Sequence, residues 1–194
     1  PRAQKSTPPS SAREKYHYFP LLSEFLASNL QVGEFDDVAE LCGGAAETGA
    51  LLVRRGGPNF DIVAGFDMRS QEEQKRLGTY ITKCKPKIFI LSTPCTGMKG
   101  FSGINRLKAP DAFQRSLKIS TELAILGAKV AMRQMNEGRH FLAEHPQGSQ
   151  MWQFKVWKKV GEHPQVVEAK IDQCMAGLMG PKSGLPVKNP TQFW

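Results

Sequence analysis

Short apolar runs alternate along the chain with longer stretches in which apolar residues recur at helical spacing. The apolar runs predict five strands, over Val38–Leu41, Asp61–Phe66, Lys87–Leu91, His140–Ala143 and Val166–Ile171. The helical spacing predicts helices over Tyr16–Leu30, Ala46–Arg55, Ser70–Cys84, Ala112–Glu137 and Met151–Val160. Residues 1–14 are expected to form a flexible arm, and the tail from Gly177 onward is expected to hold little structure.

Regular alternation of strands and helices predicts an α/β fold, with a mostly parallel sheet flanked by helices. In such sheets, ligands bind beyond the carboxyl ends of the strands. Four polar or glycine-rich features follow predicted strands, namely Glu40–Gly44, Asp67, Cys95 and Glu144. The sequence therefore predicts a single site at one edge of the sheet.

A glycine-rich turn follows the first predicted strand. Gly43, Gly44 and Gly49 allow the backbone to approach a ligand closely, and a helix N-terminus after them would add amide donors. No Gly-Lys-Ser/Thr sequence follows, which disfavours a phosphate-binding P-loop. Asp67, after the second predicted strand, is placed to bind ribose hydroxyls, so the pair indicates an adenosine-containing ligand. The alternative is that the glycines form an ordinary tight turn and that Asp67 caps the next helix.

Cys95 follows the third predicted strand and is the candidate nucleophile. A thiolate is a strong nucleophile when nearby positive charge lowers its pKa, and Lys99 and Arg106 are close in sequence. Three glycines over residues 96–103 predict a mobile loop of the kind that closes over a substrate. The alternative is a buried, inert cysteine after a core strand.

Glu144 follows the fourth predicted strand. A carboxyl group at a buried strand end tends to have a raised pKa, which suits a general acid. The alternative is an exposed acid that caps the helix after it. His145 is expected to be packed or solvent-facing rather than catalytic.

The net charge of +8 is concentrated around Cys95, because residues 71–140 hold thirteen basic and five acidic side chains. This distribution favours a polyanion such as DNA or RNA as partner, against the alternative of a solvated helix face. No apolar stretch approaches a membrane span and the N-terminus is polar, so neither membrane nor secretion is expected. Four scattered cysteines predict a reduced intracellular protein, in the nucleus or cytoplasm, without a metal site.

Taken together, these motifs resemble the cytosine-5 methyltransferases of DNA and RNA, over about residues 36–172. Glu40, Leu41, Cys42, Gly43 and Gly44 resemble the first motif that binds S-adenosylmethionine, Gly49 its later glycine, and Phe66-Asp67 the ribose-binding acid. Pro94-Cys95 resembles the end of the Pro-Pro-Cys motif, and Glu144 the glutamate of the Glu-Asn-Val motif. The resemblance implies a Rossmann-like class I methyltransferase fold. It further implies that Cys95 adds to carbon 6 of cytosine while Glu144 bonds ring nitrogen 3.

The departures from that family concern the loops and the overall size. Thr93 and Thr96 flank the cysteine where proline and glutamine are usual, and His145-Pro146 replaces Asn-Val. Residues 15–194 thus read as one catalytic domain without a target-recognition domain of ordinary size, as in a compact or retroelement- or virus-like member. A partner chain or homodimer would then supply target recognition, while Lys99, Arg106 and Lys108 would contact nucleic acid.

Two alternatives to this hypothesis remain from the residues alone. One is a degenerate methyltransferase fold that binds nucleic acid or protein without catalysis. The other is an enzyme of the same fold that methylates an exocyclic amine or a substrate other than nucleic acid.

Overall fold

The computed structural model describes residues 37–44, 56–98 and 102–194, and the chain divides into two compact units. The larger unit comprises residues 34–170 and 191–194, and the smaller comprises residues 1–33 and 171–190. The predicted arm over residues 1–14 and the predicted helices Tyr16–Leu30 and Ala46–Arg55 lie outside the described residues. Among the described residues, no helix is both long enough and apolar enough to cross a bilayer.

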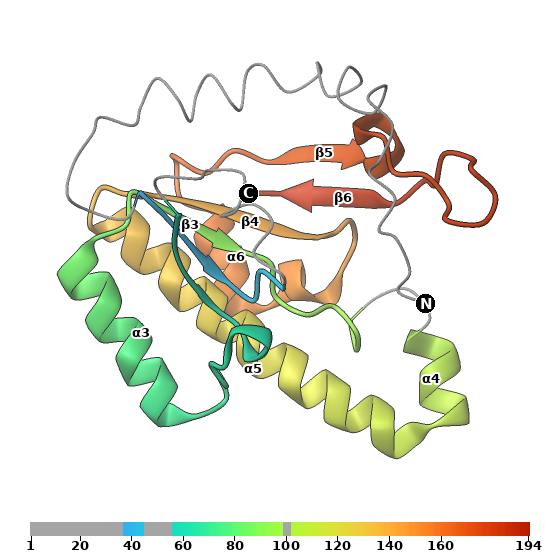
Figure 1. Cartoon of the computed structure of the whole chain (residues 1–194), viewed down its shortest axis with the longest axis horizontal. Coiled ribbons are helices and arrows are strands. Elements are labelled where there is room, and N and C mark those ends of the chain that lie inside the picture. Colours follow the sequence, from blue (N-terminus) through green and yellow to red (C-terminus); the bar gives the residue numbers. More distant parts are fainter. Residues whose placement is uncertain (1–36, 45–55, 99–101) are drawn as a thin grey trace, which may run out of the picture. The chain divides into compact units, whose positions relative to one another are not determined.

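A sheet of six strands in the order β2-β1-β3-β4-β6-β5 forms the centre of the fold (Figure 1). The strands are β1 Val38–Leu41, β2 Gly56–Phe60, β3 Ile88–Leu91, β4 His140–Pro146, β5 Ala169–Asp172 and β6 Pro190–Phe193. Neighbouring strands from β2 to β4 pair in parallel, whereas β6 runs antiparallel to β4. The sheet is therefore mixed, and the mostly parallel sheet expected from the sequence is found only among β2, β1, β3 and β4.

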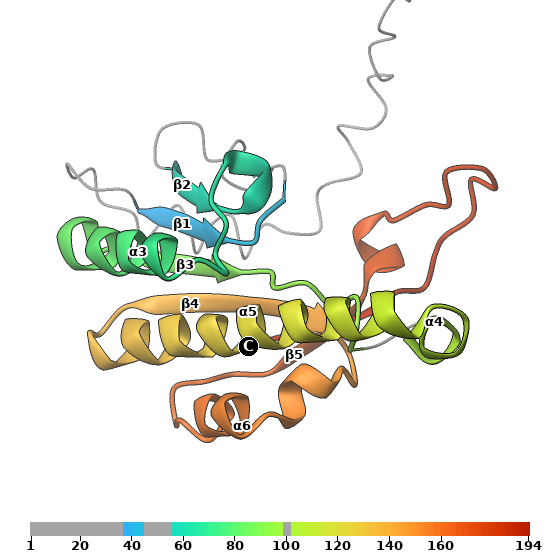
Figure 2. The same ribbon diagram turned by 90° about the horizontal axis from the view of Figure 1, so that it is seen from below.

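Helices of the larger unit flank this sheet, and Figure 2 shows the longest of them running along β4. The α-helices are α3 Gln71–Cys84, α4 Ser102–Lys108, α5 Pro110–Asn136 and α6 Lys155–Gly161, with 3₁₀ helices at Ile62–Ala64, Gln150–Gln153 and Gln173–Ala176. Ser70 caps α3, because its hydroxyl accepts a hydrogen bond from the Glu72 amide at 3.2 Å. The predicted end of α5 is also confirmed, since Gly138 follows it at φ 69°.

The hydrophobic core packs α5 against β3 and β4, and α6 packs on α5. Trp157 of α6 is fully buried, and its indole nitrogen donates a 2.9 Å hydrogen bond to the carbonyl of Ala124 in α5. Its ring meets those of Trp152 and Trp194 at centroid distances of 5.5 and 6.1 Å. This aromatic cluster joins the two helices to the segment that ends the chain.

The predicted second strand over Asp61–Phe66 is wrong, because the strand is Gly56–Phe60 and the apolar run after it forms a 3₁₀ helix. The Asp61 carboxylate accepts a 2.8 Å hydrogen bond from the Val63 amide, which starts the helical turn at that point. Ile62 and Val63 are consequently 64% and 73% exposed. A local side-chain cap thus overrides the β-propensity of the run.

Other differences arise from pairing across the sheet. Part of the tail expected to lack structure forms β6, which holds its place through hydrogen bonds with β4. The same pairing extends β4 beyond its predicted end at Ala143 to Pro146. The expected loop over residues 96–103 is, in its described parts, a turn followed by the start of α4.

We predict that Trp157→Ala lowers the free energy of unfolding by roughly 3–5 kcal/mol, because it leaves a large cavity between α5 and α6. Urea titration measures the change. The neighbouring exposed substitution Val156→Ala is the matched control and should cost about 0.5 kcal/mol or less. Equal effects of the two substitutions would contradict the packing described for α6.

Candidate functional site

The carboxyl ends of β1 and β3 lie side by side at the point where the strand order reverses. From β1 the chain continues to β2 on one side, whereas from β3 it continues to β4 on the other. Connections that leave in opposite directions open a crevice at such a point, which is where open α/β sheets bind their ligands. The candidate site is built on the loops that leave β1, β3 and β4.

The glycine turn after β1 is tied to the end of β2. The Gly43 amide donates to Asn59 Oδ1 and the Gly44 amide to Asp61 Oδ2, both at 3.1 Å, and Asn59 Nδ2 donates back to the Gly44 carbonyl at 2.9 Å. A Cβ at Gly43 would overlap the carboxylate of the buried Glu40, which would have to move to admit a side chain there. Gly44, at φ 60°, has open space around it instead.

Cys42, between Leu41 and Gly43, adopts a left-handed backbone with φ 58°, which is uncommon for a residue other than glycine. Burial, together with the charge of Asp61, raises the pKa of the Cys42 thiol to about 12. Cys42 is therefore an unreactive thiol that contributes its backbone to the turn. Gly49, the later glycine of the predicted motif, lies outside the described residues.

The acid that directly follows β2 is Asp61, not Asp67. Asp67 comes after the 3₁₀ helix and a left-handed turn at Gly65, and its carboxylate forms a 2.6 Å salt bridge with Arg69 on the surface. Hydrogen bonds from Arg69 lower the pKa of Asp67 to about 2. The placement of Asp67 at a strand end is thus wrong. Sequence reasoning missed Asp61 because the strand was expected to begin there, although an acid before an apolar run is also a capping signal.

The loop that carries Cys95 is held from several sides. The Ser92 amide donates to the Leu41 carbonyl at 3.1 Å, which keeps the start of the loop beside the glycine turn. The Met98 amide donates to the Cys95 carbonyl at 2.8 Å, and the Met98 side chain is buried in the core. Gly97 packs so closely on α5 that a Cβ would lie 2.6 Å from Leu117 Cα. The described part of the loop is thus a fixed turn.

Cys95 lies in the loop after β3, and Glu144 lies on the adjacent strand β4, one residue past the last β3–β4 pair. The predicted place of Glu144 after the strand is wrong, because pairing with Phe193 of β6 keeps it inside β4. Burial raises the pKa of the half-buried Cys95 thiol, and the nearby Glu144 carboxylate raises it further. Burial also raises the pKa of Glu144, in the direction predicted for it. The expected lowering of the Cys95 pKa by cations is not found, since Arg106 points from the surface of α4 and Lys99 lies outside the described residues.

His145 is fully buried behind the Cys95 loop. Its ring lies near the carbonyls of Thr93 and Pro94 and stands edge-on to Trp152 at 6.1 Å. Neither ring nitrogen makes a well-formed hydrogen bond with a described residue. Burial lowers the pKa of His145 to about 4, so the imidazole is neutral and packs as part of the core, as expected.

A cavity of about 220 Å³ lies beside Thr96, between the Cys95 turn and the elbow that joins α4 to α5. It offers the aromatic ring of Phe113, the amide of Asn105 and the hydroxyl of Ser116. No sequence motif marks these residues, because only the packing of α4 on α5 brings them together beside Thr96.

Some of the basic side chains form ion pairs with described acidic residues, and others do not. Ion pairs hold the basic residues at the opposite end of α5, where Arg133 and Arg139 both meet Glu137. Near the site, α4 and the first turns of α5 expose four cations that have no ion pair with a described residue, namely Arg106, Lys108, Arg115 and Lys118. The sequence analysis named Arg106 and Lys108 as contacts to nucleic acid, which stays a prediction. It missed Arg115 and Lys118, although their spacing of three residues on α5 is visible in the sequence.

No family model and no curated protein matches this chain. The candidate site is therefore argued from its geometry.

We predict that Gly97→Ala destabilises the fold by roughly 1–3 kcal/mol, because the added methyl group overlaps the α5 backbone at Leu117. Urea titration tests this. Gly103→Ala is the matched control, since that Cβ enters open space in α4 and should stabilise the helix by roughly 0.5–1 kcal/mol. A Gly97→Ala variant as stable as the control would contradict the close packing of the Cys95 turn.

We predict that Glu144→Gln shifts the pH profile of Cys95 alkylation to lower pH. Removing the carboxylate charge makes the thiolate easier to form, so the pKa of Cys95 falls, although burial still keeps it raised. Iodoacetamide labelling over a pH series, read for the Cys95 peptide by mass spectrometry, distinguishes it from the other three free cysteines. Glu162→Gln, at the exposed end of α6, should leave the profile unchanged. An unshifted profile in Glu144→Gln would mean that the two groups do not interact.

Proposed function

We propose that this protein is an S-adenosylmethionine-dependent methyltransferase acting on carbon 5 of cytosine in nucleic acid. The observation that carries the proposal is the placement of the Cys95 loop, after β3, beside Glu144 of the adjacent parallel strand β4, whose carboxylate raises the pKa of the thiol. The glycine turn of β1 starts beside the same loop, through the bond from the Ser92 amide to the Leu41 carbonyl.

The described residues at the end of β1 suit a cofactor of this kind. Gly44 is exposed beside open space, the acid Asp61 lies against it, and Pro94 follows the neighbouring strand. Asp61, rather than Asp67, is the acid we assign to this side of the site. S-adenosylmethionine, when bound, supplies an electrophilic methyl group.

Cys95 and Glu144 have complementary roles in the proposed reaction. The thiol of Cys95 gives up its proton and forms a bond to carbon 6 of cytosine, which pushes electron density toward carbon 5. Glu144 donates a hydrogen bond to ring nitrogen 3 and stabilises that density; its raised pKa favours the protonated form that donation needs. Carbon 5 would then take the methyl group and leave the demethylated cofactor. Loss of the carbon 5 proton to a base would restore the ring double bond and release the sulfur.

Recognition of nucleic acid is supported by exposed cations on the helices that follow the Cys95 loop. The four cations of α4 and α5 that have no ion pair with a described residue would attract phosphates. A target base in a duplex would have to leave the helix to reach the thiol, and the cavity beside Thr96 offers an aromatic ring and polar groups to receive it. DNA is the nucleic acid we assign first.

One observation favours a second candidate, a non-catalytic binding module. The pKa of Cys95 is raised rather than lowered, so the free protein holds an unreactive thiol. In that case the same exposed cations of α4 and α5 bind nucleic acid, and no methyl group is transferred.

We predict that Cys95→Ala abolishes transfer of labelled methyl groups from S-adenosylmethionine to DNA or RNA rich in cytosine, while calorimetric binding of the cofactor persists. Transfer requires the sulfur–carbon bond, whereas cofactor binding uses the turn at β1. Cys84→Ala, on α3, is the matched control and should retain both activities.

Three results would separate the alternatives in that experiment. Undiminished transfer by Cys95→Ala would exclude the thiolate mechanism, and a product methylated on an exocyclic nitrogen would indicate other chemistry on the same fold. Binding of nucleic acid by both proteins without any transfer would favour the binding module, with an affinity that falls steeply as salt rises.

A further inference from the structure

A groove of about 460 Å³ lies between the last turns of α5 and the helix α6, and we name it the α5–α6 groove. α6 packs on α5, and Figure 2 shows the two helices next to each other. Both helices belong to the larger unit of the chain. The lining of the groove divides into an apolar floor and a positively charged rim.

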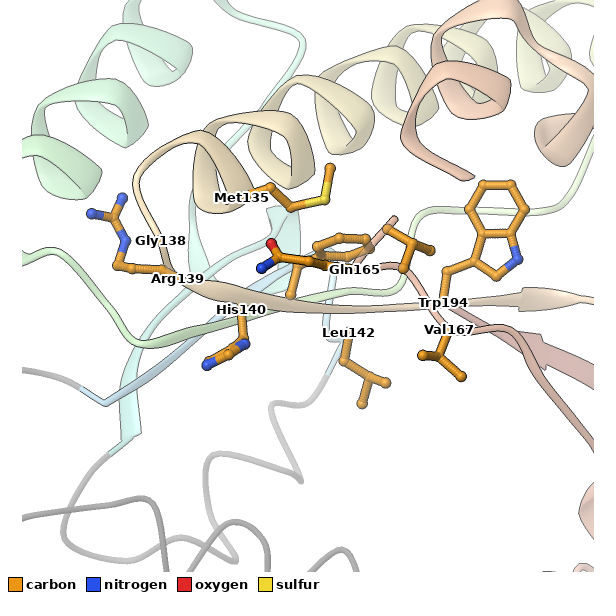
Figure 3. A pocket seen from close by; sticks show the side chains of 10 residues that line it. Met135, Gly138, Arg139, His140, Leu142, Gln165, Val167 and Trp194 are labelled. Atoms are coloured by element: carbon orange, nitrogen blue, oxygen red, sulfur yellow. The ribbon is translucent and has the colours of Figure 1, made fainter. Parts of the chain in front are cut away.

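The floor of the α5–α6 groove is aliphatic. Ala128 is buried, Met132 packs on the core from a half-buried position, and Val156 keeps 37% of its surface exposed. In Figure 3, Met135 of the same helix lies against β4, so different side chains of α5 line the groove and cover the sheet. Among the described residues that line the groove, none is aromatic. The groove therefore offers apolar area to a ligand, but no ring.

The rim of the groove carries an excess of positive charge. Lys129 of α5 and Lys159 of α6 are both exposed, and neither has an ion pair with a described residue. The described lining contains one acid, Glu137, whose carboxylate is already bound by Arg133 at 2.8 Å and by Arg139 at 2.6 Å. The two lysines are thus the charges that this groove offers to a partner.

We infer that the α5–α6 groove binds an acidic amphipathic helix of a second protein. The carboxylates of that helix meet Lys129 and Lys159, because a positively charged rim selects a negatively charged partner. Its apolar side chains enter the groove and cover Met132, an adaptable thioether at a binding surface. A groove between two helices accepts such a helix through apolar residues spaced three and four positions apart.

Nucleic acid uses this groove less fully than a polypeptide does. Phosphates would contact Lys129 and Lys159 but would leave the apolar floor uncovered. Bases gain from stacking on aromatic rings, which the described lining does not offer. An acidic amphipathic helix uses the floor and the rim together, and it is therefore the occupant we assign.

This inference does not depend on the proposed methyl transfer. α5 contributes to both places, since Ser116 lines the cavity beside Thr96 and Lys129 lines the α5–α6 groove. These two positions are about 20 Å apart along the helix, at about 1.5 Å per residue. A partner in the groove would attach at a distance from Cys95, so its binding can be measured without any chemistry at the thiol.

The test uses the full chain and the peptide fluorescein-Glu-Glu-Leu-Ala-Glu-Leu-Leu-Glu-Glu-Leu-Ala-Glu-amide as the probe. Fluorescence anisotropy should show saturable binding in the micromolar range. A control peptide with glutamine at every leucine position keeps the charge and a similar helix propensity. It should bind at least about tenfold more weakly, because it has no apolar side chains to bury on the floor of the groove.

Matched variants of the protein locate the binding. Lys159→Glu reverses a charge on the rim and should weaken binding of the leucine peptide at least about tenfold. Lys75→Glu, on the exposed face of α3, changes the net charge equally and should leave binding within about twofold. Val156→Gln makes the floor more polar without changing the charge and should weaken binding at least about threefold. Circular dichroism checks that each variant is folded.

Four results would overturn the inference. Two of them are equal binding of the leucine and glutamine peptides, and equal affinity of Lys159→Glu and Lys75→Glu for the leucine peptide. The third is a cytosine-rich oligonucleotide that binds more weakly to Lys159→Glu than to Lys75→Glu while the peptide fails to bind, because nucleic acid would then occupy the groove. The fourth is dimerisation in sedimentation that Lys159→Glu abolishes, because a second copy of the chain would then fill it.

Discussion

Parallel pairing of β1 with β3 is the constraint on which the rest of this structure depends. All four residues of β1 are buried, and each pairs in register with a residue of β3, from Val38 with Ile88 to Leu41 with Leu91. The ladder continues one bond past the strands, from the Ser92 amide to the Leu41 carbonyl. A glycine turn and a cysteine loop that are far apart in sequence therefore begin beside each other, at the point where the strand order reverses.

The same burial that holds these strands together sets the chemistry of the groups at their ends. A low-dielectric surrounding disfavours charge, so the pKa values of Cys42, Cys95 and Glu144 rise and that of His145 falls. A thiol with a raised pKa is not activated by the fold alone. In the proposed reaction, activation of Cys95 therefore requires the substrate, and the raised pKa of Glu144 favours the form that can donate a hydrogen bond.

β4 holds one side of the candidate site through two different pairings. Its amino half, from His140 to Ala143, pairs in parallel with β3. Its carboxyl half, from Glu144 to Pro146, pairs antiparallel with β6 and carries Glu144 and His145. The position of Glu144 therefore depends on pairing between β4 and a segment almost fifty residues away in the sequence.

The sequence by itself determined the elements whose signals are local. Three of the four residues in Val38–Leu41 are apolar, as suits a strand buried on both faces. Ser70 caps the helix that follows it through its own hydroxyl, and the long apolar stripe of α5 identifies that helix from its own residues. Tertiary structure decided what depends on contacts between distant residues. It made Asp61 rather than Asp67 the acid beside the glycine turn, because Asp61 bonds the Gly44 amide, and it turned residues 190–193 into a strand through pairing with β4. It also set the raised pKa of Cys95, since desolvation follows from packing around the side chain and not from its neighbours in sequence.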